Sequence, residues 1–257
     1  MPPQTGSTPG RRIRSVKIAF NIIELLQNEN DIGVTKLANE LGHSKSTIHS
    51  HLRTLEELEI LVREGNSYRL SLQILDMANH VRDQAGNYEV IQKEVEALVE
   101  ETGEIAHFGI EEYGRISYLC KATGEQAVET ASRVGTSQPI YSTSLGKSIL
   151  AYLPDSQRDS IIDTIEFAPK TSKTITSREG LYAELDQITD QGYALDNEEN
   201  IRGLRCVAAP VRNGSKVLGA ISVSGPSSRF TDERLHGELS DYVLRAANVI
   251  ELNTKFS

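Results

Sequence analysis

The stretch Leu41–Leu58, LGHSKSTIHSHLRTLEEL, decides the fold of the first part of the chain. Ser44 is a good helix N-cap. Four apolar residues then recur at spacings of four, three and three: Ile48, Leu52, Leu55 and Leu58. This spacing places one apolar stripe along a helix, so we expect a helix that buries one side in its own domain.

The opposite side of this helix carries hydrogen-bond donors and hardly any carboxylate before Glu56. At about 100° per residue, this side and its flanks contain six polar residues. They are Lys45, Ser46, Thr47, His49, Ser50 and Arg53. Such side chains bind the phosphates and base edges of DNA, and we predict that they face the major groove. An ordinary solvated helix face is the alternative for this segment taken alone.

The residues upstream favour DNA binding. Val34–Gly42 has apolar residues at helical spacing, Thr35 is a possible N-cap, and Gly42 is a helix terminator. A short helix, a turn around Gly42 and His43, and the polar-faced helix together make a helix-turn-helix.

Two short segments downstream predict a β-hairpin. Ile60–Arg63 and Tyr68–Leu70 have strand patterns and flank the turn residues Glu64–Ser67. This hairpin is the wing of a winged helix, and it places Arg63 and Arg69 for contacts with DNA phosphates.

The run from Ser15 to Leu70, with SKSTIHSHLRTLEELEILVREGNSYRL at its centre, resembles the DNA-binding domain of the IclR-type transcriptional regulators. It departs from that family at Ser50, where the family often has Arg, and at Ser71, where it often has Gly. The resemblance implies a double-stranded DNA operator as a partner.

Length and composition point to a two-domain globular protein of 257 residues, 38% hydrophobic and 25% charged. No apolar run approaches the roughly 20 residues of a membrane span, and the N-terminus has no signal-peptide core, so we expect a cytoplasmic protein. Cys120 and Cys206 are too few for a disulfide framework and have no metal-ligand spacing. We expect no metal and no cofactor.

The net charge of −9 lies entirely in the second part of the chain. Residues 1–84 hold ten Lys/Arg and ten Asp/Glu, whereas residues 85–257 hold seventeen and twenty-six. A near-neutral head on an acidic body predicts DNA binding through one local surface, with an affinity that depends strongly on salt.

The expected organisation has four parts. Residues 1–12, rich in Pro, Gly, Ser and Thr, form a disordered tail; residues 13–71 form the winged helix-turn-helix; residues 72–86 form a linker helix; and residues 87–257 form the second domain. The first helix follows Arg14, with apolar residues recurring at helical spacing: Val16, Ala19, Phe20, Ile23 and Leu26.

The linker helix carries an apolar stripe of Leu72, Leu75, Ala78 and Val81. Such a stripe needs a surface to bury it, and self-association into a homodimer or a dimer of dimers supplies one. The family resemblance implies the same dimer-forming linker. Alternatively, the stripe packs on its own domain.

Strand patterns begin at Ile105 and alternate with helices. The expected strands are Ile105–Ile110, Arg115–Cys120, Arg205–Val211 and Lys216–Ser224, the last two joined across Asn213-Gly214. The expected helices are Ser142–Tyr152, Asp155–Ile165, Arg178–Gln191 and a final helix from Thr231. An antiparallel sheet flanked by helices is an α+β domain.

This domain also resembles the IclR-type regulators. The matching stretches are PIYSTSLGKSILA at Pro139–Ala151, ALDNEENIRGLRCVAAPV at Ala194–Val211 and AISVSGP at Ala220–Pro226. With the head they cover nearly all of residues 13–252. The resemblance implies a GAF/PAS-like effector domain.

Three hydroxyl residues, Ser142, Thr143 and Ser144, open the helix in this domain. The first amides of a helix carry partial positive charge, so a small carboxylate or a sugar oxygen would bind there, and Gly146 lets the backbone come close. Plain helix capping by the hydroxyls is the alternative.

The resemblance places a set of residues around an effector pocket: Ser144, Leu145, Asp196, Leu204 and Cys206, with Ser222 and Ser224 on a nearby strand. Asp196 can accept hydrogen bonds from hydroxyls, and Leu204 supplies an apolar wall. By family analogy, the ligand is a sugar, a sugar acid or another small catabolic acid.

Two other functions stay open. One is a redox-responsive DNA-binding regulator that uses Cys206. The other is an enzyme of GAF-like fold with a dispensable head, which would need His107 or His236 beside Cys206. We expect Glu198 and Glu199 to be solvated or structural. The favoured function is a homo-oligomeric transcription regulator, not an enzyme, whose operator affinity responds to a small metabolite.

Overall fold

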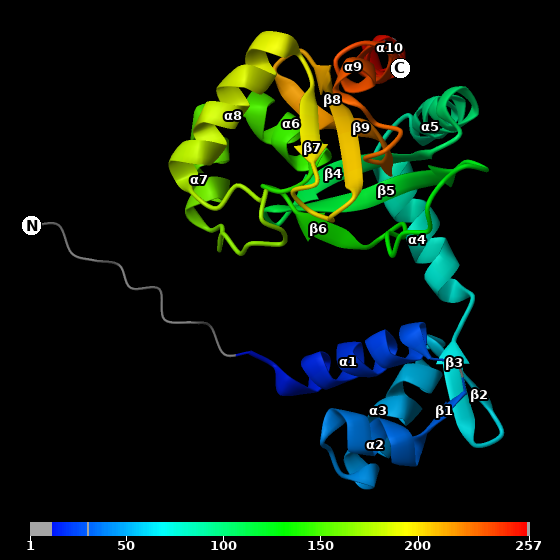
Figure 1. Ribbon diagram of the computed structural model, residues 1–257. Coiled ribbons are helices and arrows are strands. Elements are labelled where there is room, and N and C mark those ends of the chain that lie inside the picture. The colour runs from blue at the N-terminus through cyan, green and yellow to red at the C-terminus, as the bar shows by residue number, and fades with distance from the viewer. Residues whose placement is uncertain (1–11, 30, 256–257) are drawn as a thin grey trace, which may run out of the picture. The chain divides into compact units, whose positions relative to one another are not determined.

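The computed structural model describes residues 12–29 and 31–255, and the chain divides into two units after Gln84 (Figure 1). The predicted tail, residues 1–12, lies outside the described residues except for Arg12. No helix in the described part of the chain is long and apolar enough to cross a membrane.

The first unit is a winged helix. Its elements are α1 (Arg14–Asn28), β1 (Ile32–Gly33), α2 (Val34–Leu41), α3 (Lys45–Glu57), β2 (Leu61–Glu64), β3 (Ser67–Leu70) and α4 (Gln73–Gln84). The predicted helix-turn-helix and wing are both present. Strand β1 adds a third strand, in the order β1-β3-β2. This strand was not predicted, because two residues are too few to show an alternating pattern.

Helix α3 begins as its sequence predicts. The Ser44 hydroxyl accepts the backbone N–H of Thr47 at 3.1 Å, and Gly42 ends α2 in the left-handed conformation. Ile48, Leu52 and Leu55 are buried in one core with residues of α1, α2, β1, β2 and β3. The predicted stripe ends there, because Leu58 caps the helix and is 60% exposed.

Helix α1 buries a side that overlaps only in part with the predicted stripe, since Leu26 is buried and Ala19 and Ile23 pack against the core. Ile18, Ile22 and Leu26 enter the core, whereas Val16 and Phe20 are exposed. Helix α4 has no buried residue, and its apolar residues Leu75 and Val81 are more than half exposed in the single chain, as is Leu72 just before the helix. The first unit therefore presents apolar side chains that its own core does not cover.

The second unit is an antiparallel six-stranded sheet in the order β6-β5-β4-β9-β8-β7, with helices on both faces. Its strands are β4 (Ile105–Glu112), β5 (Arg115–Thr123), β6 (Ser137–Pro139), β7 (Ala194–Asn197), β8 (Leu204–Asn213) and β9 (Lys216–Pro226). Its helices are α5 (Tyr88–Thr102), α6 (Ser144–Tyr152), α7 (Asp155–Asp163), α8 (Arg178–Gln191), α9 (Asp232–Leu235) and α10 (Glu238–Lys255).

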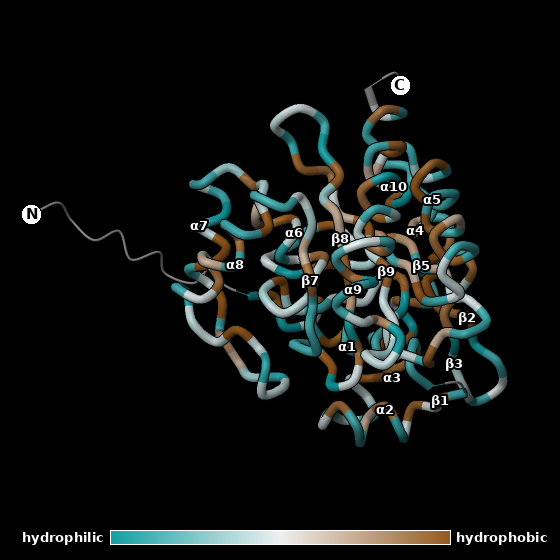
Figure 2. The backbone as a smooth tube through the Cα atoms, turned by 45° about the horizontal axis from the view of Figure 1, so that its top comes forward, coloured by the Kyte–Doolittle hydropathy of each residue, from teal (hydrophilic) through white to brown (hydrophobic). Residues whose placement is uncertain are grey.

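Alternating residues of the central strands point to the two faces of the sheet. Val207 and Val223 pack with α5 and α10, whereas the small residues Ala208 and Ala220 pack with α6 and α8. Helices α5 and α10 show both hydropathy colours along their turns in Figure 2, as expected for helices with one buried side. The small residues beneath α6 let this helix approach the sheet closely.

The predicted α+β architecture is confirmed, with local differences. The final helix is divided into α9 and α10, because α9 ends at Leu235 and Gly237 interrupts the run. Helix α7 ends at Asp163 and not at Ile165. Strands β6 and β7 were not predicted, since three and four residues are too few to show alternation.

Leu52→Ala should destabilise the first unit. Leu52 is fully buried, so the change removes apolar contacts and leaves a cavity, at a cost of about 2–5 kcal/mol. Leu58→Ala, in the exposed cap of the same helix, is the matched control and should change stability by less than about 1 kcal/mol. Urea denaturation followed by circular dichroism measures both. Equal effects of the two substitutions would contradict this assignment of the core.

Candidate functional site

A cavity of about 70 Å³ lies in the second unit, beside the first turn of α6. Seven of the eight residues predicted to bind the effector line it: Ser144, Leu145, Asp196, Leu204, Cys206, Ser222 and Ser224. Nine other residues complete the lining: His107, Tyr118, Thr130, Ala131, Ser132, Gln138, Thr143, Asn200 and Ile201.

Strand register creates the polar floor of this cavity. Asp196 pairs with Cys206, and Cys206 pairs with Ser224, so three strands place these side chains in one row. Ser222 and His107 are register partners in the next row. Residues two apart on a strand share a face, so both rows point toward α6.

The three hydroxyls before α6 have three separate roles. The Thr143 hydroxyl caps the helix by accepting the N–H of Gly146 at 3.1 Å. The Ser142 hydroxyl donates to Asn200 Oδ1 at 3.3 Å. Ser144 lines the cavity with Leu145. Capping therefore accounts for one hydroxyl of the three, and the cavity lies against the first turn of α6, whose first amides have no partner within the helix.

Gly146, the eighth predicted residue, does not line the cavity. A Cβ atom at this position would lie 2.0 Å from the carbonyl oxygen of Ile140. The glycine is needed for the close approach of α6 to the segment before it, and this approach is what sets the helix over the sheet.

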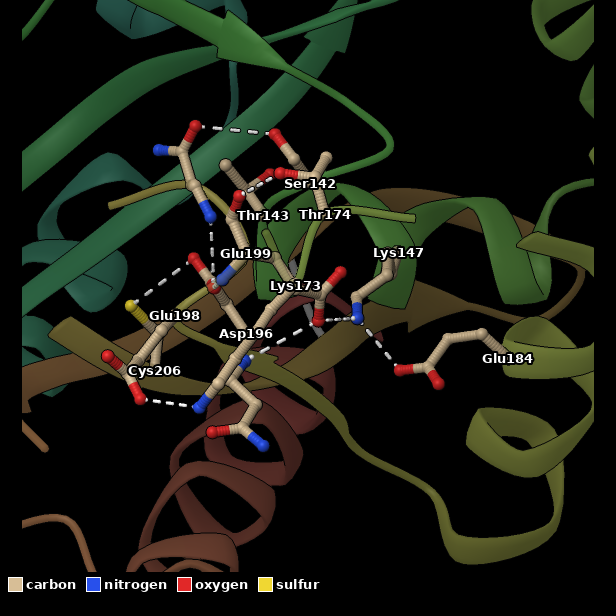
Figure 3. A network of polar contacts seen from close by, with 12 residues as sticks. Ser142, Thr143, Lys147, Lys173, Thr174, Glu184, Asp196, Glu198, Glu199 and Cys206 are labelled. Carbon is tan, nitrogen blue, oxygen red and sulfur yellow. Dashed lines mark hydrogen bonds and ion pairs between the residues drawn. The ribbon is translucent and has the colours of Figure 1, made fainter. Parts of the chain in front are cut away.

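Asp196 is nearly fully buried, with its two carboxyl oxygens in different surroundings (Figure 3). Oδ1 accepts the backbone N–H groups of Glu199 at 2.7 Å and Asn200 at 3.3 Å. Oδ2 faces the thiol of Cys206 at 3.9 Å. Burial, together with the charge of Glu199, raises the pKa of Asp196 to about 7.

Cys206 is a neutral thiol in this setting. Burial and the neighbouring Asp196 carboxyl raise its pKa well above the ordinary value. A thiol with a raised pKa is a poor nucleophile and a slow target for oxidants. The geometry therefore favours hydrogen bonding over covalent or redox chemistry at this residue.

Neither candidate histidine activates Cys206. Burial and the nearby Lys121 lower the pKa of His107 to about 3, so its ring is too weak a base to take the thiol proton, and it stacks on Tyr118. The His236 ring is hydrogen-bonded to the hydroxyl of Tyr193 at 2.8 Å and does not line the cavity. In the described part of the chain, no group of three His, Cys, Asp or Glu side chains is arranged to hold a metal ion.

Lys147 is a component of the site that the sequence reasoning missed. Its ammonium group is fully buried and pairs with Glu199 at 2.5 Å and with Glu184 at 2.8 Å (Figure 3). Burial opposes its charge, but the two carboxylates outweigh that effect and raise the pKa of Lys147. Glu199 is thus structural, and Glu198 likewise pairs with Lys173 at 2.6 Å. A single charged residue in a helix of apolar, small and hydroxyl residues was the available signal.

Residues 130–132, which we call the cover segment, were also missed. They belong to the irregular chain between β5 and β6, where no periodicity marks them. The Ser132 hydroxyl lies 3.0 Å from His107 Nε2, and Lys121 Nζ donates to the Ser132 carbonyl at 2.7 Å. These contacts hold the cover segment along the cavity.

The predicted DNA-contacting residues lie mainly on the exposed side of α3. Lys45, Ser46, His49, Ser50 and Arg53 are exposed, and Thr47 is half-buried. The Thr47 hydroxyl lies 2.8 Å from the Ser44 hydroxyl, so it helps to cap the helix.

Three exposed arginines form weak contacts within the first unit. Arg53 Nε donates to Glu57 at 2.9 Å, one turn further along α3. In the wing, Arg63 Nε donates to the Gly65 carbonyl at 3.0 Å and Arg69 Nε donates to Glu64 at 2.5 Å. Exposed ion pairs contribute little to stability, so these side chains can exchange partners at small cost.

Two family models match this chain, one for each unit. Residues 15–65 match the IclR helix-turn-helix domain, and residues 81–252 match the family described as bacterial transcriptional regulator IclR C-terminal. A probable HTH-type transcriptional regulator, ArcR of Halobacterium salinarum, is 34% identical over 94% of each chain.

Two crystal structures share the fold. The IclR protein of Thermotoga maritima is 29% identical, with a TM-score of 0.81 over 94% of this chain and 99% of that one. An IclR homolog of Microbacterium hydrocarbonoxydans, complexed with 4-hydroxybenzoate, is 18% identical, with a TM-score of 0.80 over 95% of this chain and 100% of that one. The matched families comprise regulators and not enzymes. The chain therefore belongs to the IclR family of transcriptional regulators, with an N-terminal helix-turn-helix domain and a C-terminal ligand-binding domain.

Proposed function

We propose that this regulator binds a small organic acid in the cavity beside α6 and that the acid controls its affinity for a DNA operator. The observation that carries the proposal is the polar floor of Asp196, Cys206, Ser222 and Ser224 facing the first turn of a helix. A carboxylate suits the first amides of α6, and hydroxyl or keto oxygens suit the floor.

The size of the cavity limits the ligand. A water molecule needs roughly 10–15 Å³ of such space, so about 70 Å³ accommodates on the order of five groups of that size. An acid of three or four carbons fits without rearrangement. A six-carbon sugar acid, or an aromatic acid such as the one bound by the Microbacterium homolog, needs more space than this.

The proposed DNA surface comprises the exposed side of α3 and the wing. Lys45, Ser46, Thr47, His49, Ser50 and Arg53 would read the major groove, with Arg63 and Arg69 on phosphates. This assignment is supported by the exposure of seven of these eight residues and by the small cost of releasing the arginines from their present partners.

Self-association is proposed to bury the exposed apolar side chains of the first unit. The stripe on α4 and the exposed residues Val16 and Phe20 of α1 would be covered by a second copy of the chain. A dimer contacts two half-sites at once. A ligand can then change operator affinity only by its different affinity for two arrangements of the DNA-binding heads.

Arg53→Ala should reduce operator affinity by at least tenfold, because it removes a cation from the DNA-facing side of α3 while disturbing only an exposed ion pair. Glu57→Ala removes the same ion pair and keeps the cation, so it is the matched control and should preserve binding. Fluorescence anisotropy with the chain's own promoter DNA measures both. Equal losses in the two variants would show that the ion pair, and not the arginine, matters.

Ligand binding should raise the melting temperature of the full chain. We would screen pyruvate, lactate, D-xylonate, D-gluconate and 4-hydroxybenzoate by thermal shift, since a ligand at 100 times its dissociation constant adds about 2.7 kcal/mol. Asp196→Ala should abolish the shift, whereas Glu198→Ala, which lies outside the cavity lining, should keep it. A shift that survives in Asp196→Ala would place the ligand elsewhere.

A further inference from the structure

The cavity contains a carboxyl group without a cation of its own. Asp196 is 3% exposed, and the nearest buried cation, Lys147, already pairs with Glu199 and Glu184. None of the residues that line the cavity is a lysine or an arginine. Three carboxyl groups thus share one buried positive charge.

The groups that face Asp196 come from every neighbouring element. Glu199 follows it in the turn after β7, Lys147 approaches from α6, Cys206 lies on β8 and Tyr118 on β5. Among these side chains, Lys147 alone stabilises a negative charge on Asp196, and the backbone N–H groups of Glu199 and Asn200 add to its effect. Glu199 opposes that charge, and burial raises the pKa values of both Cys206 and Tyr118, which keeps them uncharged.

The geometry also shows where a proton on Asp196 would be placed. Oδ1 accepts hydrogen bonds from two backbone N–H groups, and a proton on this oxygen would lie against those N–H hydrogens. Among the described residues, Oδ2 has a single hydrogen-bonding neighbour, the thiol of Cys206 at 3.9 Å, and a thiol is a weak donor. The acid proton therefore belongs on Oδ2, and from there it can be donated to an acceptor in the cavity.

An anionic ligand would strengthen the preference of Asp196 for its protonated form. A carboxylate at the first turn of α6 would share a small enclosed space with Asp196, and two negative charges in such a space cannot both be accommodated without a cation. The preference of Asp196 for its neutral form, already given by a pKa of about 7, then extends to higher pH.

We propose that Asp196 meets the ligand as a neutral carboxylic acid whose Oδ2 proton is donated to the ligand, so that the site selects singly charged acids and takes up one proton from solvent for each ligand bound above neutral pH. This inference rests on the proposed function, because it assumes an acid in the cavity. Asp196 is then a specificity-determining residue that disfavours dicarboxylates and disfavours any ligand lacking an acceptor opposite Oδ2.

Isothermal titration calorimetry on the full chain tests the proton uptake. The titrant is whichever acid of the thermal-shift panel gives the largest shift, measured at pH 8 in HEPES and in Tris, which differ in ionisation enthalpy. We expect about one proton taken up at pH 8 and fewer than about 0.2 at pH 5.5. The dissociation constant should rise about tenfold per pH unit above pH 7.5, since only the protonated fraction binds.

Asp196→Asn imitates the neutral acid but cannot titrate. The variant therefore distinguishes an effect of protonation from an effect on the fold. This variant should bind the same acid within about threefold of the wild-type affinity at pH 6, with no proton uptake and no pH dependence up to pH 8.5. Asp190→Asn, an exposed aspartate on α8, is the matched control and should behave as the wild type. Binding by the wild type at pH 8 without proton uptake would overturn the inference while leaving the proposed function intact.

If no acid in the panel binds, the proposed function is contradicted, and a measurement without ligand still tests the neutral form of Asp196 on which the inference depends. Because burial raises the pKa of Asp196 from 3.8 to about 7, its carboxyl favours the folded state below pH 4, and this advantage is lost as the pH rises to about 7. Asp196→Asn should therefore gain stability over the wild type between pH 5 and 7 and keep that gain at pH 8. A constant difference across this range would show that Asp196 is ionised throughout.

Discussion

The buried ammonium group of Lys147 is the constraint on which the cavity depends. It joins α6 to α8 through Glu184 and to the turn after β7 through Glu199. The backbone N–H of Glu199 in turn binds Asp196, so the charge on α6 and the floor of the cavity are held in one network. Removing one partner of a buried pair costs about 3–5 kcal/mol, because the other charge is left uncompensated. The network therefore fixes position more than it adds net stability.

The parts of the fold that could be predicted are those whose signals are local. The Ser44 cap and the spacing of Ile48, Leu52 and Leu55 predict α3 from one helical turn to the next, and Asn213-Gly214 predicts the β8–β9 hairpin from two residues. Strands β6 and β7 are too short to alternate, and the break before α10 depends on a single Gly237 within an apolar pattern. Local reasoning fails where an element is too short to repeat its pattern more than once or twice.

The candidate site divides along a similar line. The motifs that resemble the family supplied Asp196, Cys206 and Ser144, which line one cavity although they lie on three elements. The partners of these residues could not be predicted, because they are set by register and by loops. His107 enters the cavity only through its pairing with Ser222, and Ser132 only through a segment with no repeating pattern. Gly146 was predicted to bind the effector but has a packing role instead. In a sequence, a glycine that lets two backbone segments approach each other cannot be told from a glycine that makes room for a ligand.

The position of the cavity follows from a change of side-chain type along one face of the sheet. Ala194, Ala208 and Ala220 are small and apolar, and they allow α6 to pack closely on the middle of that face. Toward the first turn of α6, the same face carries Asp196, Cys206 and Ser224, which are nearly as buried and are polar. Apolar side chains there would continue the core, and burying polar groups without strong partners is costly. This polar row gives up apolar packing, and it faces helix amides that have no partner within the helix. Both features are best explained by a polar molecule that completes the hydrogen bonds. The same reasoning accounts for a neutral Asp196, because none of the residues that line the cavity is a lysine or an arginine, and a protonated carboxyl adds a strong donor to the hydroxyls of Ser222 and Ser224.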